Sequence, residues 1–335
     1  MPSSFVICLL TLAISANLGC RETDKTEPST TPWRSAFEAA DDGAFLSAWG
    51  RSDSDVWVVG GQLKNGVAWH YNGQVWQRAD TPDGPLLNWT HGYDDHQWIV
   101  GNDGRILYRT DPASPWTTQS STTNLPLWGV WAASTNEAWA VGGDPIASGD
   151  PDPVLLHWSE GRWSRVPIPA IDREFRALFK VWGTGPQNVY AVGARGVIIH
   201  YDGTAWRQRS SSTPRDLVSL WGRGQNDILA VGGRANGVLV RYDGTSWTPK
   251  VLDTEPGLNG VWMDAKGQAT VVGGRGRILT VEANGFAYER QESTNQLLLH
   301  GVWGSDTGYR ISAGGSLDRN PPWAGVVLEK RTQSE

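Results

Sequence analysis

The amino-acid sequence predicts an all-β protein, a seven-bladed β-propeller built from four-stranded antiparallel blades. Three observations lead to this fold class. The 335 residues include 40 Gly and 20 Trp, a composition typical of many short strands joined by tight turns. A sequence unit near 41 residues long recurs seven times. Within the units, short apolar segments are separated by Asp-Gly or Asn-Gly turns, which favour antiparallel hairpins.

Each repeat is marked by a Gly that ends an apolar strand. Successive marker positions lie 41 residues apart in four of six intervals, with 51 and 39 residues in the others. The markers are Gly60, Gly101, Gly142, Gly193, Gly232, Gly273 and Gly314. The first strand of each unit contains a Trp that we expect at one equivalent position in every blade. These residues are Trp49, Trp89, Trp131, Trp182, Trp221, Trp262 and Trp303.

A polar turn, a second strand such as VWVVG at 56–60, and a third strand ending in a turn such as HYDG at 200–203 complete most of the unit. An aromatic residue then opens the fourth strand. One such sheet cannot cover both of its own faces, so radial stacking of seven sheets is expected. We expect the first-strand and fourth-strand Trp side chains to pack between blades, with a ligand-facing role for individual ones as the alternative. The fourth-strand aromatic residues are Trp76, Trp116, Trp163, Trp206, Trp247 and Tyr288.

The seventh unit has a third strand at 325–331 but no fourth strand after it. The segment at 31–35, TPWRS, resembles the fourth strands of other units, such as AWRQ at 205–208. We therefore predict that the N-terminal segment around Trp33 pairs beside 325–331. This pairing would close the last blade without a disulfide.

The pattern VWG…AVG…HYDG-x-x-W over residues 33–331 resembles the Trp/Gly-rich propeller repeats of bacterial surface and secreted proteins related to the Asp-box (BNR) class. In that class the box, here residues 202–206, stabilises a turn away from active sites. The resemblance implies the propeller fold and leaves the activity open. Sialidase-like enzymes share this propeller, which implies an alternative with several Arg, an acid and a Tyr over the central channel.

Residues 1–20 are interpreted as a signal peptide, because the apolar run at 5–16 is too short to span a bilayer. The segment resembles a bacterial lipoprotein signal, which implies lipidation at Cys20. Arg21 stands where family sorting signals place Asp for inner-membrane retention, so we expect an outer-membrane, lipid-anchored protein that faces the periplasm or the cell surface. Ordinary secretion and an uncleaved anchor are the alternatives. Residues 21–32 are expected to be a flexible tether before a propeller at 33–331.

Composition and motifs exclude several function classes. The formal net charge is -6 and no Lys/Arg run is present, so no nucleic-acid partner is expected. The sequence contains no HExxH, GxSxG, Walker A, EF-hand or CxxC motif, and we predict no cofactor, metal or catalytic residue. His70, His157 and His200 share one repeat position and are expected to form hydrogen bonds near turns. The acids of loop 143–153 could hold Ca²⁺, although a solvated loop is the preferred interpretation.

Long loops single out one rim of the predicted ring. Loops 143–153 and 315–324 join second to third strands and loop 166–177 joins two blades, and both classes emerge on the same rim. The second-to-third-strand loops carry basic residues in six of seven blades: Lys64, Arg105, Arg195, Arg234, Arg275 and Arg319. The opposite rim carries acidic turn residues: Asp53, Asp55, Asp94, Asp95, Glu137, Asp202, Asp227, Asp243 and Asp306.

This charge pattern suits an anionic ligand, with ordinary solvated turn residues as the alternative. The candidate ligand-binding residues are Arg195, Arg234, Arg275, Arg319 and Trp323. Together the observations favour a monomeric, non-catalytic cell-envelope module that binds or scaffolds a partner protein or an anionic glycan and meets the membrane only through its lipid anchor. Two alternatives stay open: a multivalent lectin with sugar pockets between blades, and a glycan hydrolase or lyase with one central site.

Overall fold

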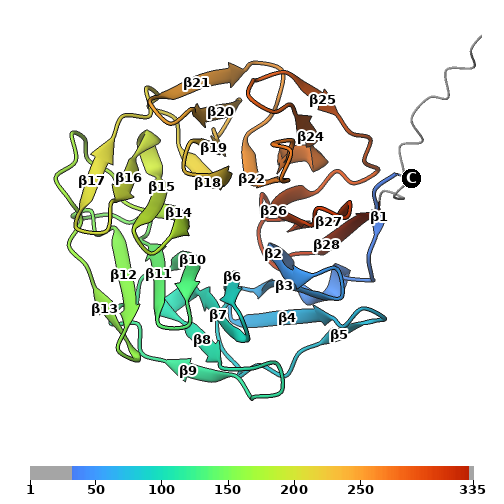
Figure 1. The fold of residues 1–335 in the computed structure, drawn as a ribbon. Helices are drawn as coiled ribbons and strands as arrows, with labels where there is room; N and C mark the ends of the chain where they lie inside the picture. The colour runs from blue at the N-terminus through green and yellow to red at the C-terminus, as the bar shows by residue number, and fades with distance from the viewer. Residues whose placement is uncertain (1–31, 332–335) are drawn as a thin grey trace, which may run out of the picture. The chain divides into compact units, whose positions relative to one another are not determined.

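The computed structural model describes residues 32–331, which form seven four-stranded antiparallel sheets arranged radially around a central axis (Figure 1). Each sheet is one blade, and its first strand lies innermost, as Figure 1 shows. The predicted seven-bladed β-propeller is therefore confirmed.

The strands follow the sequence units in order. Blades 1 and 2 contain β2 (Ala44–Ser52), β3 (Asp55–Gln62), β4 (Asn65–Tyr71), β5 (Trp76–Arg78), and β6 (Leu87–Tyr93), β7 (His96–Gly101), β8 (Ile106–Arg109), β9 (Thr117–Gln119). Blades 3 and 4 contain β10 (Leu127–Ser134), β11 (Glu137–Gly142), β12 (Val154–Ser159), β13 (Arg162–Arg165), and β14 (Leu178–Gly185), β15 (Asn188–Gly193), β16 (Ile198–Tyr201), β17 (Trp206–Arg209). Blades 5 and 6 contain β18 (Leu217–Gly224), β19 (Asp227–Gly232), β20 (Gly237–Tyr242), β21 (Trp247–Leu252), and β22 (Leu258–Met263), β23 (Ala269–Gly273), β24 (Ile278–Val281), β25 (Tyr288–Arg290).

Blade 7 contains β26 (Leu298–Gly304), β27 (Tyr309–Gly315), β28 (Gly325–Arg331) and, from the other end of the chain, β1 (Arg34–Ser35). Short 3-10 turns lie before blade 1 and between the second and third strands of blades 2, 4 and 6. They are η1 (Ala40–Asp42), η2 (Asn102–Gly104), η3 (Ala194–Gly196) and η4 (Gly274–Gly276).

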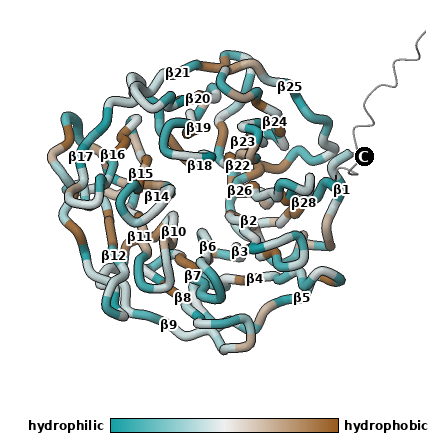
Figure 2. The backbone as a smooth tube through the Cα atoms, in the orientation of Figure 1, coloured by the Kyte–Doolittle hydropathy of each residue, from teal (hydrophilic) through white to brown (hydrophobic). Residues whose placement is uncertain are grey.

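The core lies between the blades. In β11 every residue after Glu137 is buried, and in β15 every residue after Asn188 is buried, because neighbouring blades cover both faces of each middle strand. Figure 2 shows hydrophobic residues along the strands and largely hydrophilic residues in the connecting loops. This two-sided burial explains why the second strands read as continuous apolar runs in the sequence instead of alternating.

The N-terminal segment closes the ring as predicted. Strand β1 pairs antiparallel with β28, with Arg34 opposite Glu329, and the Ala36 N–H donates to the Val327 carbonyl at 2.9 Å. The Arg34 guanidinium also donates from Nε to Glu329 Oε1 at 3.0 Å. Trp33 is buried, with 6% of its surface exposed. The closing contact therefore combines a backbone ladder with a buried indole.

The third-to-fourth-strand turns use the Asp or Asn side chain of the repeat. The carboxylate of Asp202 accepts from the N–H groups of Thr204 and Ala205, both at 3.0 Å. Asn72 and Asp243 make the same pair of contacts in blades 1 and 5. These are Asx turns, which stabilise the bend locally. The turn-stabilising role implied by the family resemblance is thus seen in the structure.

Ten of the thirteen Trp residues predicted to pack between blades are buried, and Trp76, Trp89 and Trp221 are half-buried. Four first-strand Trp rings lie against the Gly that follows the equivalent position in the next blade. A methyl group added to Gly50, Gly92, Gly183 or Gly222 would lie 2.9, 2.6, 2.9 or 2.8 Å from Trp303, Trp49, Trp131 or Trp182, respectively. The recurring Trp-Gly pair is therefore a packing device: each Gly makes room for the indole of the preceding blade.

The predicted Trp position was wrong in blade 2. Trp49 lies opposite Trp57 in blade 1, whereas in blade 2 it is His91 that lies opposite the matching Trp98. Trp89 lies two residues earlier, opposite Val100, at a position that faces the central channel. The smaller His91 ring leaves room at the next position in blade 3. Ala132 replaces the usual Gly there, and its N–H donates to His91 Nδ1 at 3.2 Å.

The signal peptide at 1–20, Cys20 and nearly all of the tether at 21–32 lie outside the described residues. Within residues 32–331, no helix is long and apolar enough to cross a membrane.

Candidate functional site

The central channel is filled with side chains. The innermost strands contribute a lining that includes Trp49, Trp89, Trp131, Trp182, Trp221 and Trp303, and these side chains leave a cavity of about 20 Å³. That volume holds about one water molecule. The titratable side chains in its lining are His91 and Lys180, and burial lowers the pKa of both, that of His91 to about 3. No carboxylate of residues 32–331 lines this cavity, so the described residues place there no acid of the kind that a glycan hydrolase requires.

Two rims flank the channel. We call the end that carries the second-to-third-strand loops and the blade-to-blade connections the crossover rim, and the end that carries the hairpin turns the turn rim. Loops 143–153, 166–177 and 315–324 belong to the crossover rim, since they follow β11, β13 and β27. All of the predicted ligand-binding residues lie on this rim.

Arg195 and Arg234 are brought together by a carboxylate that the sequence analysis did not single out. Asp216 accepts from the Arg195 backbone N–H at 2.8 Å through Oδ1 and from Arg234 Nε at 2.6 Å through Oδ2. The Arg234 guanidinium also lies 5.7 Å from the ring centroid of Phe179. Arg195 occupies a left-handed backbone conformation, with φ of 57°, at the tip of η3. Its side chain is exposed and forms no ion pair within the described residues.

Arg319 and Trp323 form part of a continuous patch where blade 7 meets blade 1. Trp323 Nε1 donates to the Arg319 carbonyl at 2.8 Å. The Trp323 backbone N–H and carbonyl both bond to the Gln62 side chain, at 2.8 and 2.7 Å. Leu317 and Trp323 pack on a small core of Ala44, Leu46 and Leu86, and the Leu63 carbonyl accepts from the Leu86 N–H at 3.2 Å.

We call Leu63, Lys64, Leu317, Arg319 and Trp323 the seam patch. Leu63 is 45% exposed, Lys64 and Arg319 are exposed, and Leu317 and Trp323 are half-buried. The side chains of Lys64 and Arg319 form no ion pair within the described residues. Apolar surface and two unneutralised cations thus share one small area on the crossover rim.

Arg275 and Arg105 differ in their surroundings. Arg275 lies exposed at the tip of η4, in a left-handed conformation like that of Arg195. Arg105, by contrast, turns inward: it is buried, and its NH1 donates to the Pro85 carbonyl at 2.6 Å. The two are not equivalent, because Asp103 occupies the matching left-handed position in blade 2. Arg105 is therefore not part of an exposed basic ring, because its side chain binds the preceding loop.

Blade 3 interrupts the basic ring, as its acidic loop predicted. Ile146, at the tip of loop 143–153, is 90% exposed. Its backbone N–H donates to Asp144 Oδ1 at 3.0 Å, and Asp152 pairs with Arg165. Within residues 32–331, no group of three or more His, Cys, Asp or Glu side chains is arranged to hold a metal ion.

The histidines of the turn rim form the predicted hydrogen bonds. His70 Nε2 lies 2.8 Å from Asp55 Oδ1, and its ring stacks on Trp57 with centroids 4.3 Å apart. His157 pairs with Glu137 at 2.8 Å and His200 with Asn188 at 2.7 Å, each also stacked on a second-strand aromatic ring. This repeated arrangement links the second and third strands of a blade and has a structural role.

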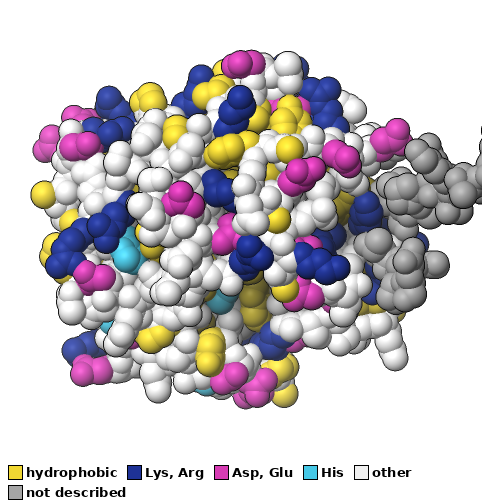
Figure 3. All heavy atoms as spheres, turned by 45° about the horizontal axis from the view of Figure 1, so that its top comes forward, with side chains coloured by type: hydrophobic (Ala, Val, Ile, Leu, Met, Phe, Trp, Pro, Cys, Tyr) yellow, Lys and Arg dark blue, Asp and Glu magenta, His cyan; other side chains and the backbone are white. Residues whose placement is uncertain are grey.

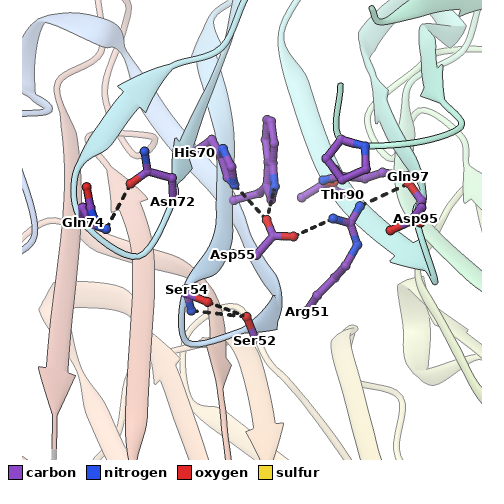
Figure 4. A network of polar contacts seen from close by, with 12 residues as sticks. Arg51, Ser52, Ser54, Asp55, His70, Asn72, Gln74, Thr90, Asp95 and Gln97 are labelled. Carbon is purple, nitrogen blue, oxygen red and sulfur yellow. Dashed lines mark hydrogen bonds and ion pairs between the residues drawn. The ribbon is translucent and has the colours of Figure 1, made fainter. Parts of the chain in front are cut away.

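Figure 4 shows Asp55 between His70 and Arg51. Burial alone would raise the pKa of Asp55, but hydrogen bonds from His70 and Trp57 and the charge of Arg51 outweigh it and lower the pKa to about 2. Arg51 and Arg223 thus pair with acids of the turn rim, Asp55 and Asp227. These pairs reduce the predicted charge contrast between the rims. Figure 3 shows basic and acidic side chains interspersed over the face that it presents.

Sequence reasoning missed Leu63, Leu317, Asp216 and Lys180. Leu63 and Leu317 carry a weak signal, since each is a large aliphatic residue in a loop between strands. Lys180 carries a stronger one. It stands in a first strand where the other blades have Ser, Gly or Trp.

No family model and no curated protein matches this chain. Many solved structures are similar to it, among them the following three. YCF48 from Cyanidioschyzon merolae has a TM-score of 0.65 and 14% identity, covering 90% of this chain and 98% of that one. YCF48 bound to D1 peptide has a TM-score of 0.63 and 13% identity, covering 91% and 98%. The WD40 β-propeller domain of Doa1 has a TM-score of 0.68 and 13% identity, covering 90% and 98%. At these identities the similarity establishes the β-propeller fold and nothing narrower.

Proposed function

We propose that this protein is a non-catalytic binding propeller that docks a partner protein through the crossover rim. The seam patch carries the proposal, because it combines exposed Leu63 and half-buried Trp323 with Lys64 and Arg319, whose charges are not neutralised by an ion pair within the described residues. Aromatic and Arg side chains are enriched in the centres of protein interfaces. The partner segment that suits the patch has an apolar side chain next to a carboxylate.

The position of the patch suits docking. The Gln62 side chain accepts from the Trp323 backbone N–H and donates to the Trp323 carbonyl, so the backbone of the loop is fixed before a partner arrives. Such preorganisation lowers the entropy lost on binding. The filled channel disfavours the alternative of a central hydrolase or lyase site, since it leaves no room for a sugar ring. One structural neighbour, YCF48, is described as bound to D1 peptide, which supports a peptide-binding use of such a fold.

The test is a binding screen with the full chain against an array of immobilised peptides that combine acidic and apolar residues, and against a panel of acidic glycans. We expect peptide binding that the double variant Leu63→Ser/Arg319→Ala weakens at least tenfold. Arg207→Ala, an exposed arginine near a hairpin turn, is the matched control and should retain binding. Binding to glycans alone would favour the lectin alternative. Peptide binding that survives the double variant would contradict the proposed site.

We also propose that the propeller is tethered to the outer membrane through lipid on Cys20, with secretion as the alternative. The support is the sequence resemblance of residues 1–20 to a lipoprotein signal. Mass spectrometry of the protein from its native host tests this proposal. A diacylglyceryl-modified Cys20 at the mature N-terminus is expected, and an unmodified Cys20 thiol would overturn it.

A further inference from the structure

One layer of the central channel contains a buried lysine that forms no ion pair with any described residue. Seven residues of the innermost strands share one register position, opposite a second-strand Val in six blades and Ala in the seventh. They are Ser47, Trp89, Gly129, Lys180, Ser219, Gly260 and Gly301. Five of these seven side chains are Ser or Gly. Lys180 is the one ionisable residue among the seven, and only 3% of its surface is exposed.

The Lys180 side chain extends across the channel from blade 4 to blade 2. Its Nζ lies 2.6 Å from the ring centroid of Trp89, which is two blades away. Gly129 stands between them in the ring, and a methyl group there would lie 3.2 Å from the Lys180 α-carbon. The absent side chain at Gly129 thus leaves space for the lysine to reach the indole.

Among residues 32–331, no side chain in the lining of this cavity carries a compensating negative charge. Lys180 forms no ion pair or hydrogen bond with any described residue, and no Asp or Glu lines the cavity beside it. His300 adds no negative charge either, because an imidazole is neutral or positive. Its Nδ1 bonds to the Leu46 carbonyl at 2.9 Å, and its pKa is lowered to about 4 by burial and by the nearby Lys180. Ser219, in the same layer, is buried, and its hydroxyl forms no hydrogen bond within the described residues. A buried ammonium that contacts an aromatic ring but has no counter-charge remains costly to desolvate.

We infer that the central channel holds one monovalent anion of about the size of chloride, beside Lys180 Nζ and the Ser219 hydroxyl. The cavity lined by both residues has a volume of about 20 Å³, which fits a particle near the size of one water molecule and excludes sulfate, phosphate and carboxylic acids. Burial lowers the pKa of Lys180 well below its usual range in the protein alone. An anion in the cavity would restore the charged form.

Thermal unfolding of the full chain tests the inference, with gluconate replaced stepwise by chloride at constant ionic strength. We expect the melting temperature to rise by about 2–4 °C with chloride and then level off, as for a ligand that binds only the folded state. Lys180→Met, which keeps the length and apolar stem, should abolish the rise. Lys250→Met, at an exposed position, should retain it. The inference would be overturned if chloride did not change the melting temperature, or if chloride still raised the melting temperature of Lys180→Met.

A second measurement keeps the test decisive if Lys180→Met fails to fold. Crystals of the unmodified chain grown in bromide should show one anomalous peak within hydrogen-bonding distance of Lys180 Nζ. No peak there, combined with peaks only at surface residues, would also overturn the inference.

Discussion

A methyl group added to the α-carbon of Gly183 in β14 would lie 2.9 Å from Cη2 of Trp131, which projects from β10 of the preceding blade. It would also lie 2.6 Å from the carbonyl oxygen of Asn188. The indole of one blade and the bare backbone of the next therefore occupy adjoining space. The same relationship links Trp303 to Gly50, so it also spans the joint between the last blade and the first.

Gly183→Ala should lower the free energy of unfolding by about 1–3 kcal/mol, because the added methyl group must displace Trp131 or the β14–β15 ladder. Gly185→Ala is the matched control on the same strand, since no atom lies within 4 Å of an added methyl group there. Urea unfolding followed by far-ultraviolet circular dichroism measures both. Equal effects of the two substitutions would contradict the packing role of the Trp-Gly pair.

His91→Trp should destabilise the chain, because the larger indole would meet the methyl group of Ala132, whereas four other blades have a Gly beside the Trp of the preceding blade. The double variant His91→Trp/Ala132→Gly recreates the Trp-Gly arrangement of those four blades and should recover at least half of the loss. A double-mutant cycle by urea unfolding gives the coupling energy, which we expect to be about 1 kcal/mol or more. Additive effects would show that the two positions do not share the inter-blade space.

Much of the fold could be predicted because each blade buries the same positions and so repeats the same residue types. The repeat pattern misplaced Trp89, because a Trp two residues out of register satisfies the same apolar pattern as a Trp in register. The Gly after His91 was the better guide, because its role depends on a neighbouring blade. The residue that closes the ring, Trp33, was predictable because the fourth-strand pattern is local.

The candidate site was harder to predict, because loop positions do not repeat. Arg105 and Arg275 lie in loops of the same class, yet one is buried against Pro85 and the other is exposed. The direction of such a side chain depends on the preceding blade-to-blade loop, which has its own sequence in each blade. Likewise, the contact between Gln62 and Trp323 joins residues at opposite ends of the chain, and no local pattern indicates it.

Trp33→Ala should lower the free energy of unfolding by about 3–5 kcal/mol, the usual effect of removing a buried indole. The loss should also make blade 7 more accessible to proteolysis, because β1 pairs with β28 there. Trp323→Ala, at a half-buried position on the crossover rim, should have a smaller effect on stability. If the two substitutions were equally destabilising, Trp33 would have no special role in closing the ring.

Asp55 should make the stability depend on pH. Its pKa is about 2 in the folded chain against an ordinary value of 3.8, so its ionised form stabilises the fold. This contribution is fully present above about pH 4 and is lost as the pH falls through 3.8 towards 2. Asp55→Asn should therefore lower the free energy of unfolding by about 2 kcal/mol more at pH 6 than at pH 2. Parallel stability curves for the two proteins would contradict the Asp55 network.

Hydrogen exchange of the full chain, with and without a peptide selected from the acidic-apolar array, tests the proposed function most directly. We predict that the bound peptide slows exchange in loop 315–324 and in the Gln62–Asn65 connection, which together carry the seam patch, and leaves the hairpin turns unchanged. Protection confined to the turn rim, or spread over equivalent grooves in several blades, would contradict docking at the junction of blades 7 and 1.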